Sequence, residues 1–394
     1  MKSCGVVVEY NPFHNGHKYH LEQAREKSGA DVIVAVMSGN FLQRGEPAVI
    51  DKWLRTKESL LNGADLVIEL PFAYAVQSAD YFTRGSVQIL QNLKVDSLCF
   101  GTDSNECLDY GAFGKFHQEN SDKINQKYQE IKNNGSNYPQ LMTQVYRELY
   151  PEWALDFSSP NHILGMGYAK ENASHEKPMM LYPIQRVGNE YHDKEISHDR
   201  FASATSIREK VLSGERIDLE KLVPKETLKD LEESELVYLE KSWSYLKYQL
   251  IIQPVEQLRK TYQMVEGLEY RLKEAAISST NFNEFLQKVK SKRYTWTRIQ
   301  RLCMYVLLQV TQSEIEGTWN QPYLRVLGFN DQGRQFLKEK KKEITYPVIT
   351  NINKKNEQLL SLDIKAGRMY SLISQSEKYQ DYYQAPIYIK EEEK

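Results

Sequence analysis

Two histidines near the N-terminus are the side chains in this sequence best suited to chemistry on a phosphate group. His14 and His17 flank Gly16 within the stretch 9–17, EYNPFHNGH. An apolar run precedes this stretch and an amphipathic segment follows it, so both imidazoles are predicted near the start of a helix. Helix N-termini bind phosphate through free N–H groups and the helix dipole. The imidazoles could donate hydrogen bonds to charge that grows in a transition state, and Gly16 would let a flat ring such as adenine approach the backbone.

Two other interpretations of the histidine pair stay open: a zinc site, or two polar loop residues. A zinc site needs a third protein ligand. No nearby Cys or His has a familiar ligand spacing, and no CxxC pair is formed by the four cysteines, which are Cys4, Cys99, Cys107 and Cys303. We therefore predict neither a protein metal site nor a disulfide framework.

A second phosphate-binding element is predicted at residues 206–208 (SIR). The hydroxyl of Ser206 and the guanidinium of Arg208, at the start of a helix, suit a polyphosphate tail. The alternative is that this stretch only caps a helix, with Ser203 or Thr205 as the N-cap residue.

The elements that must position these side chains alternate along residues 1–215. Short apolar runs follow amphipathic stretches, which indicates a parallel α/β sheet. Asp51 suits the N-cap of the second helix, and Gly101 ends the fourth strand, where an open α/β sheet binds ligands. Strands are predicted at 4–9, 31–37, 66–70, 95–100 and 178–184, and helices at 16–27, 51–61, 79–92, 106–148 and 161–170.

The second half of the chain is predicted to be mostly helical. Helical spacing recurs at 226–247, 256–276, 281–291 and 295–311, and short strands are predicted only near the C-terminus, in YPVITNI and APIYIK. We therefore expect a catalytic domain at 1–215, a helical domain at 216–345 and a mixed segment at 346–394 that packs on the rest.

Composition excludes several classes of protein. The chain has 394 residues, of which 41% are hydrophobic and 26% charged, which rules out a disordered or fibrous chain. Mean hydropathy is −0.61. No apolar run reaches the roughly 20 residues of a membrane helix, and the N-terminal run is too short for a signal peptide. A cytoplasmic protein without membrane contact is expected. Because the net charge is −2, any nucleic-acid surface must be local.

Two clusters of basic residues are candidates for that surface. The first cluster combines basic residues with Tyr294 and Trp296, whose rings could stack on nucleobases. Its basic residues are Lys288, Lys290, Lys292, Arg293, Arg298 and Arg301. Within it, Arg298 and Arg301 are predicted to share a helix face. The second comprises Arg334, Lys338, Lys340, Lys341 and Lys342. Either cluster could instead be a solvated face.

The motifs together resemble a known group of enzymes. The stretch 14–17 resembles the HxGH signature of the nucleotidylyltransferase superfamily, and SATSIR at 203–208 resembles its late Ser-x-x-Ile-Arg type motif. Longer strings are similar to the bacterial tRNA(Met) cytidine acetate ligase family: GVVVEYNPFHNGH, VAVMSGNFLQRGEPA, GADLVIELP, FGTDSN, RYTWTRIQR and LRVLGFNDQGRQFL. The resemblance covers most of the chain and implies a Rossmann-like sheet followed by a helical domain.

The resemblance implies an activity with ATP as co-substrate. In that family, acetate and ATP give acetyl-adenylate and pyrophosphate, and the acetyl group then passes to N4 of the wobble cytidine in the anticodon loop of elongator tRNA(Met), giving N4-acetylcytidine. His14, His17 and Lys18 would offset the repulsion between acetate and the α-phosphate. Mg²⁺ could accompany ATP. The resemblance assigns no general base to the second step.

The resemblance also implies site residues by position. Nucleotide contacts would be made by Val7, Val8, Glu9, Tyr10, Asn11, Pro12, Phe13, His14, Asn15, Gly16, His17, Lys18, Tyr19, His20, Gly101, Asn161, Arg186, Ser206 and Arg208. The loop after the second strand, including Gln43 and Glu46, is expected to contact acetate or cytidine, chiefly through Ser38, Gly39, Asn40 and Arg44. The tRNA would meet Lys290, Lys292, Arg293, Arg298 and Arg301.

Three other functions would account for parts of this pattern. A small-metabolite adenylyltransferase would share the histidine loop but would not need a helical half with basic and aromatic residues. An aminoacyl-tRNA synthetase would use similar histidines, but the sequence holds no KMSKS-like loop. A non-catalytic RNA-binding protein would not need His14 and His17 intact.

Overall fold

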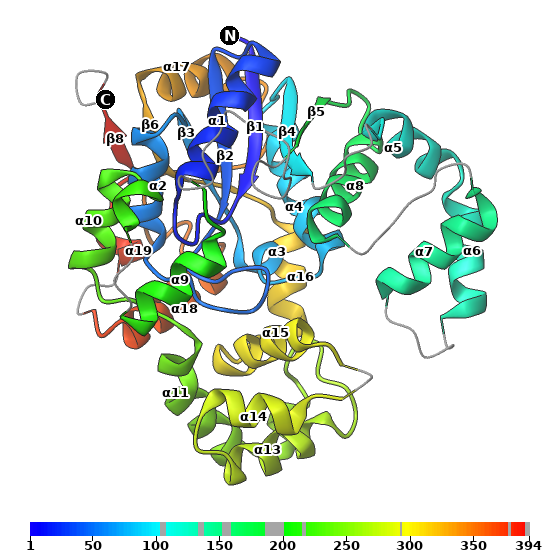
Figure 1. The fold of residues 1–394 in the computed structure, drawn as a ribbon, viewed down its shortest axis with the longest axis vertical. Coiled ribbons are helices and arrows are strands. Elements are labelled where there is room, and N and C mark those ends of the chain that lie inside the picture. Colours follow the sequence, from blue (N-terminus) through cyan, green and yellow to red (C-terminus); the bar gives the residue numbers. More distant parts are fainter. Residues whose placement is uncertain are drawn as a thin grey trace.

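The computed structural model describes residues 1–102, 108–132, 138–151, 159–185, 201–214, 218–291, 294–376 and 380–390. The fold is α/β: a mostly parallel sheet with helices on both faces, and a helical unit that lies below the sheet in the view of Figure 1. Among the described residues, no helix combines the length and apolar character needed to cross a bilayer.

Five parallel strands form the central part of the sheet, in the order β5-β4-β1-β2-β3. The chain passes from β1 to β2 on one side, whereas β4 pairs with β1 on the other. The carboxyl ends of β1 and β4 therefore flank the crevice where open α/β sheets bind ligands. All five predicted strands are confirmed to within two residues: β1 (Ser3–Val8), β2 (Val32–Ser38), β3 (Leu66–Leu70), β4 (Ser97–Thr102) and β5 (Met180–Gln185).

Helices cover both faces of this sheet. Ile33 and Ala35 of β2 belong to the core on the side of α1 and α2, whereas Val34 and Val36 belong to the core on the side of α4 and α8. Burial on both faces explains why the strands are continuous apolar runs. The predicted helices are confirmed as α1 (Asn15–Ser28), α2 (Lys52–Leu61), α4 (Ala79–Asn92) and α8 (Pro160–Ala173), with the short α3 (Phe72–Ala75) before α4.

The polar helical stretch predicted at 106–148 forms an arm beside the sheet. Its described parts are helical and project away from the sheet, on the right in Figure 1. The arm rejoins the fold through α5, which packs against α8. Its helices are α5 (Tyr110–Glu119), α6 (Ser121–Ile131) and α7 (Tyr138–Leu149).

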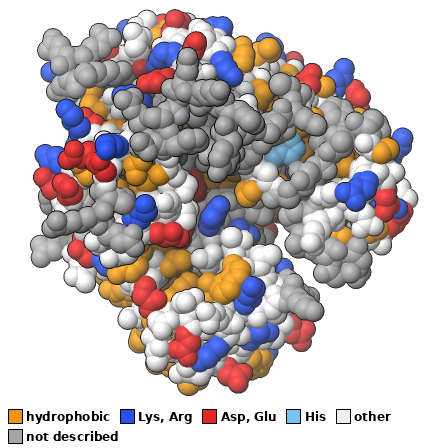
Figure 2. Space-filling model, viewed as in Figure 1, with side chains coloured by type: hydrophobic (Ala, Val, Ile, Leu, Met, Phe, Trp, Pro, Cys, Tyr) orange, Lys and Arg blue, Asp and Glu red, His pale blue; other side chains and the backbone are white. Residues whose placement is uncertain are grey.

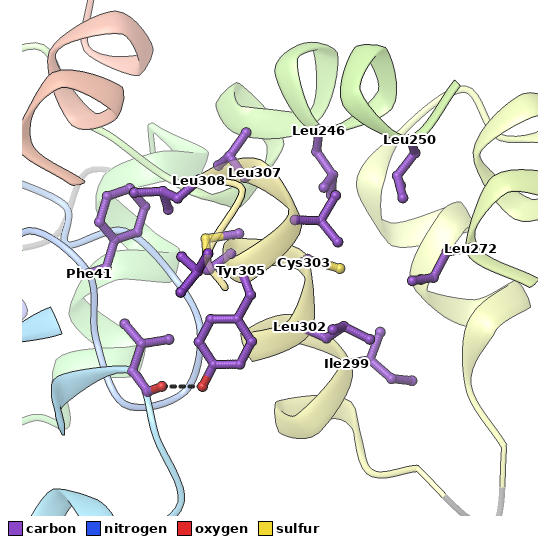
Figure 3. Packing of buried hydrophobic residues seen from close by; sticks show 14 of the residues in the cluster. Phe41, Leu246, Leu250, Leu272, Ile299, Leu302, Cys303, Tyr305, Leu307 and Leu308 are labelled. Atoms are coloured by element: carbon purple, nitrogen blue, oxygen red, sulfur yellow. Dashed lines mark hydrogen bonds between the residues drawn. The ribbon is translucent and has the colours of Figure 1, made fainter. Parts of the chain in front are cut away.

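The lower helical unit has its own core, which continues into the α/β part. Leucines from several helices surround α15, and Phe41, from the loop after β2, packs against the same cluster (Figure 3). The hydroxyl of Tyr305 donates a hydrogen bond to the carbonyl of Val76. The helices that lead to this unit and form it are α9 (Ala204–Ser213), η3 (Leu219–Lys221), α10 (Lys225–Glu233), α11 (Leu239–Ile252), α12 (Val255–Leu258), α13 (Leu268–Ser278), α14 (Phe282–Val289), α15 (Trp296–Leu307) and α16 (Gln312–Asn320).

The chain then returns to the sheet, earlier than the sequence suggested. Residues 324–330, expected within a helical interval, form β6, which pairs antiparallel with β3 and extends the sheet. The two short predicted C-terminal strands are confirmed as β7 and β8, both parallel to β6. The remaining elements are β6 (Leu324–Asn330), α17 (Asp331–Lys340), β7 (Val348–Ile349), α18 (Ser361–Ile373), α19 (Gln380–Tyr383) and β8 (Ile387–Ile389).

Candidate active site

A cavity of about 500 Å³ opens at the carboxyl ends of β1, β4 and β5. Its size is typical of pockets that hold a small molecule. The first turn of α1, the loop after β2, helix α8 and the residues before α9 complete its wall. It therefore lies at the crevice that the strand order defines.

His14 caps the helix that borders this cavity. Its Nδ1 accepts a hydrogen bond of 3.0 Å from the backbone N–H of Gly16, and the side chain is only 6% exposed. Because Nδ1 is the acceptor, a neutral His14 carries its proton on Nε2. The imidazole ring of His17 stacks on that of His14, with centroids 3.7 Å apart. Both rings line the cavity, so this turn can present hydrogen-bond donors to a bound phosphate.

Gly16 makes room for the imidazole of His14. A Cβ at this position would lie 2.8 Å from Cε1 of His14. The missing side chain therefore makes room for the imidazole that caps the helix. Gly16 also lines the cavity, so the approach of adenine to its backbone stays a prediction.

Arg208 connects the late helix to the first turn. Its Nη1 donates a hydrogen bond of 2.6 Å to the carbonyl of Asn11, and its Nη2 lies 3.5 Å from a carboxylate oxygen of Glu46. Of the two predicted cap residues, Ser203 caps α9 by accepting from the N–H of Ser206. The two motifs that the sequence singled out thus meet across one cavity.

Most of the predicted nucleotide contacts line this cavity. They are Val7, Val8, Glu9, Tyr10, Asn11, His14, Gly16, His17, Tyr19, His20, Gly101, Asn161 and Arg208. Five others do not line it: Pro12, Phe13, Asn15, Lys18 and Ser206. The side-chain amide of Asn15 instead donates to the carbonyl of Lys221, which ties α1 to η3. Lys18 is exposed. Arg186 lies outside the described residues.

The predicted acetate or cytidine contacts are only partly placed at the cavity. Arg44, Gln43 and Glu46 line it, but Ser38, Gly39 and Asn40 do not. Ser38 and Asn40 are buried, and Asn40 accepts a hydrogen bond from the backbone N–H of Lys52. These three residues hold the loop in place, which leaves Arg44 as the member of the set that can reach a ligand.

The loop at 42–46 is also the point where the lower helical unit meets the site. Gly45 has φ +81, and a Cβ on it would lie 2.3 Å from the backbone nitrogen of Arg301. Nη1 of Arg301 donates to the carbonyl of Gln43. The backbone of α15 therefore supports one wall of the cavity.

The residues predicted to form the RNA surface do not all face the same way. Nζ of Lys290 lies 4.6 Å from the ring centre of Trp296, and the Arg298 guanidinium lies 4.9 Å from that of Tyr294. Arg301, in contrast, turns toward the cavity loop. Burial lowers the pKa of Arg301, and the charge of Arg298 lowers it further. The expectation that both arginines present one exposed face is therefore corrected. Lys292 and Arg293 lie outside the described residues.

Lys290 is exposed and Trp296 and Arg298 are partly exposed, but Tyr294 is buried in the core of the lower helical unit, so the expectation that its ring could stack on a nucleobase is corrected. Lys and Arg side chains are spread over that unit, and a notch separates it from the α6–α7 arm in the view of Figure 2.

Several cavity residues were missed by the sequence analysis. Phe82, Phe100, Leu164 and Tyr168 line the wall opposite α1, and residues 201–205 line another part. These side chains follow ordinary helix and strand patterns, so nothing in the sequence distinguishes them from core residues. Only the packing of α4 and α8 against β4 brings them to the cavity.

Among the described residues, no group of three or more His, Cys, Asp or Glu side chains is arranged to hold a metal ion.

Comparison with known proteins extends these observations. The family described as HIGH Nucleotidyl Transferase matches residues 1–385. A tRNA(Met) cytidine acetate ligase from Limosilactobacillus reuteri is 44% identical over 99% of this chain and 100% of that protein. The tRNA(Met) cytidine acetate ligase of Bacillus subtilis is 38% identical over 100% of this chain and 99% of its own length.

Two crystal structures of Thermotoga maritima TmcAL share the fold, each with a TM-score of 0.88 over 99% of this chain and 100% of theirs. The apo form is 32% identical in sequence, and the form bound with alpha-thio ATP is 30% identical. These similarities extend over both the sheet and the helical unit. This chain belongs to the HIGH nucleotidyl transferase family and, within it, to the tRNA(Met) cytidine acetate ligases.

Proposed function

We propose that this protein uses ATP to activate acetate as acetyl-AMP, with release of pyrophosphate, and transfers the acetyl group to N4 of the wobble cytidine of elongator tRNA(Met). ATP binding is supported by the alpha-thio ATP complex of the Thermotoga maritima relative. The tRNA substrate is supported by the names of the curated relatives. The reaction would take place in the cytoplasm, where its tRNA substrate is found.

In the first step, an acetate oxygen attacks the α-phosphorus and pyrophosphate leaves. Both reactants are negatively charged, so the site must offset their repulsion. His14 and His17 lie at the positive end of α1, and Arg44 and Arg208 line the same cavity. These four side chains are the donors and charges that we assign to the triphosphate and acetate. We propose that Mg²⁺ binds together with the triphosphate of ATP.

In the second step, the N4 amine attacks the acetyl carbonyl and AMP leaves. The exocyclic amine of cytosine is a weak nucleophile, and the base must leave the anticodon loop to reach the cavity. Lys290 and Arg298 in the lower unit, each beside an aromatic ring, are the tRNA contacts we propose. The domain roles would then be activation in the sheet of residues 1–215 and RNA binding in the helices that follow, up to α16, after which the chain returns to the sheet at β6.

One observation carries the proposal: His14, His17 and Arg208, predicted separately, lie on a single nucleotide-sized cavity at the carboxyl ends of β1 and β4. The test is incubation of the protein with labelled acetate, ATP and bulk tRNA, followed by nucleoside analysis. Labelled N4-acetylcytidine that forms only with ATP is expected.

The main rival is a small-metabolite adenylyltransferase, which would join AMP to a substrate and keep it there. That activity predicts pyrophosphate release without any requirement for acetate, and no label in tRNA. A non-catalytic RNA-binding protein would bind tRNA with no ATP turnover. Either result would end the proposal.

A further inference from the structure

Glu9 presents a carboxylate to the cavity at the end of β1. Its Oε1 accepts hydrogen bonds from the backbone N–H of Gln43 at 2.7 Å and from the hydroxyl of Ser38 at 3.4 Å. Among the residues that the structure describes, none donates a hydrogen bond to Oε2. Glu9 lines the cavity. One oxygen thus fixes the side chain, and the other is left for a ligand.

The surroundings make this carboxylate a better base than an ordinary glutamate. Burial raises the pKa of Glu9, and the charge of Glu46 raises it further. The hydrogen bond from the Gln43 N–H and the charges of Arg55 and Arg44 lower the pKa of Glu9 but do not reverse the shift. A carboxylate whose pKa is raised accepts a proton more readily than an ordinary glutamate does.

Aromatic side chains form the wall beside Glu9. Phe82, Phe100 and Tyr168 line the cavity, and the rings of Phe100 and Tyr168 lie 5.6 Å apart. Burial raises the pKa of Tyr168, and the charge of Glu9, which lines the same cavity, raises it further. A flat pyrimidine can pack against such a wall, and Glu is a preferred acceptor for the N4 amine of cytosine.

We propose that Glu9 is the general base of acetyl transfer, receiving a proton from N4 of the target cytidine. This inference rests on the proposed function. The N4 lone pair forms a C–N bond to the acetyl carbon, and the carbonyl pair moves to oxygen. When the carbonyl re-forms, the bond between the acetyl carbon and the phosphate oxygen breaks, and AMP leaves with that electron pair. The N4 proton goes to Oε2 of Glu9 and then to solvent.

Two other groups of the cavity, Glu46 and His14, are less suited to this role. A carboxylate oxygen of Glu46 lies 3.5 Å from the Arg208 guanidinium, and a carboxylate that is paired with a fixed cation is a weaker base. Nδ1 of His14 accepts the Gly16 N–H, which occupies the basic nitrogen of that ring. Glu9 has neither restriction.

Glu9→Gln tests the proposal without removing the side chain's structural bond, because an amide oxygen can still accept the Gln43 N–H. Two half-reactions are measured separately: acetate-dependent exchange of pyrophosphate into ATP, and transfer from preformed acetyl-AMP to tRNA in a single turnover. We expect transfer to fall about 100-fold or more, and to fall far more than exchange does. Glu9→Asp, which keeps a carboxylate, should recover part of the transfer rate.

Glu46→Gln is the matched comparison, since it neutralises the second carboxylate of the cavity. It should raise the KM for ATP through Arg208 and impair transfer far less than Glu9→Gln does. Normal transfer by Glu9→Gln, or equal loss of both half-reactions, would overturn the assignment while leaving the proposed function intact. A wild-type protein that does not acetylate tRNA would overturn both, so the two failures are distinguishable.

Discussion

The imidazole of His14 has two roles at the scale of a single residue. It caps α1 through Nδ1 and lines the cavity with the rest of the ring. These roles can be separated because Asn is also a good N-cap residue but does not reach as far. His17 has no capping role, so its contribution is expected to be chemical.

Replacing His14 with Asn and with Ala should therefore have different effects on stability. We expect both His14→Asn and His14→Ala to lower acetate-dependent pyrophosphate exchange by about 100-fold or more, because both remove the ring nitrogen. Only His14→Ala should lower the free energy of unfolding, by about 1 kcal/mol. His17→Ala should abolish exchange without loss of stability.

Binding of tRNA to these variants, measured by filter retention, is the control. It should stay close to wild type. Exchange at the wild-type rate by His14→Asn would remove this residue from the chemistry, and an equal loss of tRNA binding would indicate misfolding.

Glu58 is a second residue whose environment makes a testable prediction. It is fully buried on α2, and neither carboxylate oxygen has a hydrogen-bond partner among the described residues. Burial raises the pKa of Glu58 well above its ordinary value, and the charge of Asp230 on α10 raises it further. The folded protein therefore holds this proton at pH values where the unfolded chain has released it.

The free energy of unfolding should depend on pH through Glu58. Because the folded-state pKa is raised, the stability contributed by Glu58 is present below about pH 4.5 and is lost as pH rises toward the folded pKa. Glu58→Gln removes this penalty and should raise the free energy of unfolding by about 1–3 kcal/mol at pH 8, with a smaller gain at pH 5. Thermal melts at both pH values are the measurement. The exposed Glu22→Gln should show neither effect. A lower Tm for Glu58→Gln at pH 8 would contradict the argument.

At the scale of elements, α15 links the proposed RNA surface to the wall of the cavity. Its first turn carries Arg298, which we assign to tRNA binding together with Lys290 before the helix, and its backbone packs directly against Gly45 in the loop at 42–46. The helix that we assign to RNA binding and one wall of the cavity are therefore in contact. This explains why Arg301, one turn along the helix, is mostly withdrawn from the surface.

The RNA surface on α15 and the preceding turn can be tested by salt dependence. Lys290→Ala with Arg298→Ala should weaken tRNA binding and lower the slope of log K against log salt by about 1 for each phosphate that the protein no longer neutralises. Exchange of pyrophosphate into ATP should be unaffected. Lys338→Ala with Lys341→Ala removes two charges from the second basic cluster and serves as the comparison. A reduced slope for that pair alone would move the RNA surface to α17 and the turn after it.

At the scale of the whole molecule, the C-terminal segment is fastened to the sheet by buried charges. Nζ of Lys52 on α2 lies 2.7 Å from Glu69 of β3 and 2.6 Å from Asp381 of α19, and all three side chains are buried. Burial alone would lower the pKa of Lys52, but the charges of Asp381 and Glu69 outweigh it and raise that pKa to about 12. Lys52 therefore stays charged and depends on its carboxylate partners.

Loss of one carboxylate partner of Lys52 should lower the stability of the protein. Asp381→Ala is expected to lower the free energy of unfolding by about 3 kcal/mol, because part of a buried charge is left uncompensated. The exposed pair of Lys221 and Asp218 provides the control, and Asp218→Ala should change stability by less than about 1 kcal/mol. Denaturant unfolding of both variants is the measurement. Equal, small effects would show that the buried cluster does not anchor the C-terminus.

The sequence by itself determined the five parallel strands, their helices and the two motifs that are predicted to bind phosphate. These features depend on local patterns: an apolar run, a cap such as Asp51, and the spacing of His14, Gly16 and His17. Local interactions are enough to specify them, so they could be predicted from neighbouring residues.

Only the tertiary structure decided what meets across long distances in the chain. β6 pairs with β3, with Arg325 opposite Glu69, although a short apolar run inside a helical region gave no sign of it. The aromatic wall around Tyr168, the ion pair of Glu46 with Arg208 and the withdrawal of Arg301 likewise depend on partners far away in sequence. The physical reason is that a side chain's burial and charge environment are set by the elements packed against it, which periodicity along the chain does not record.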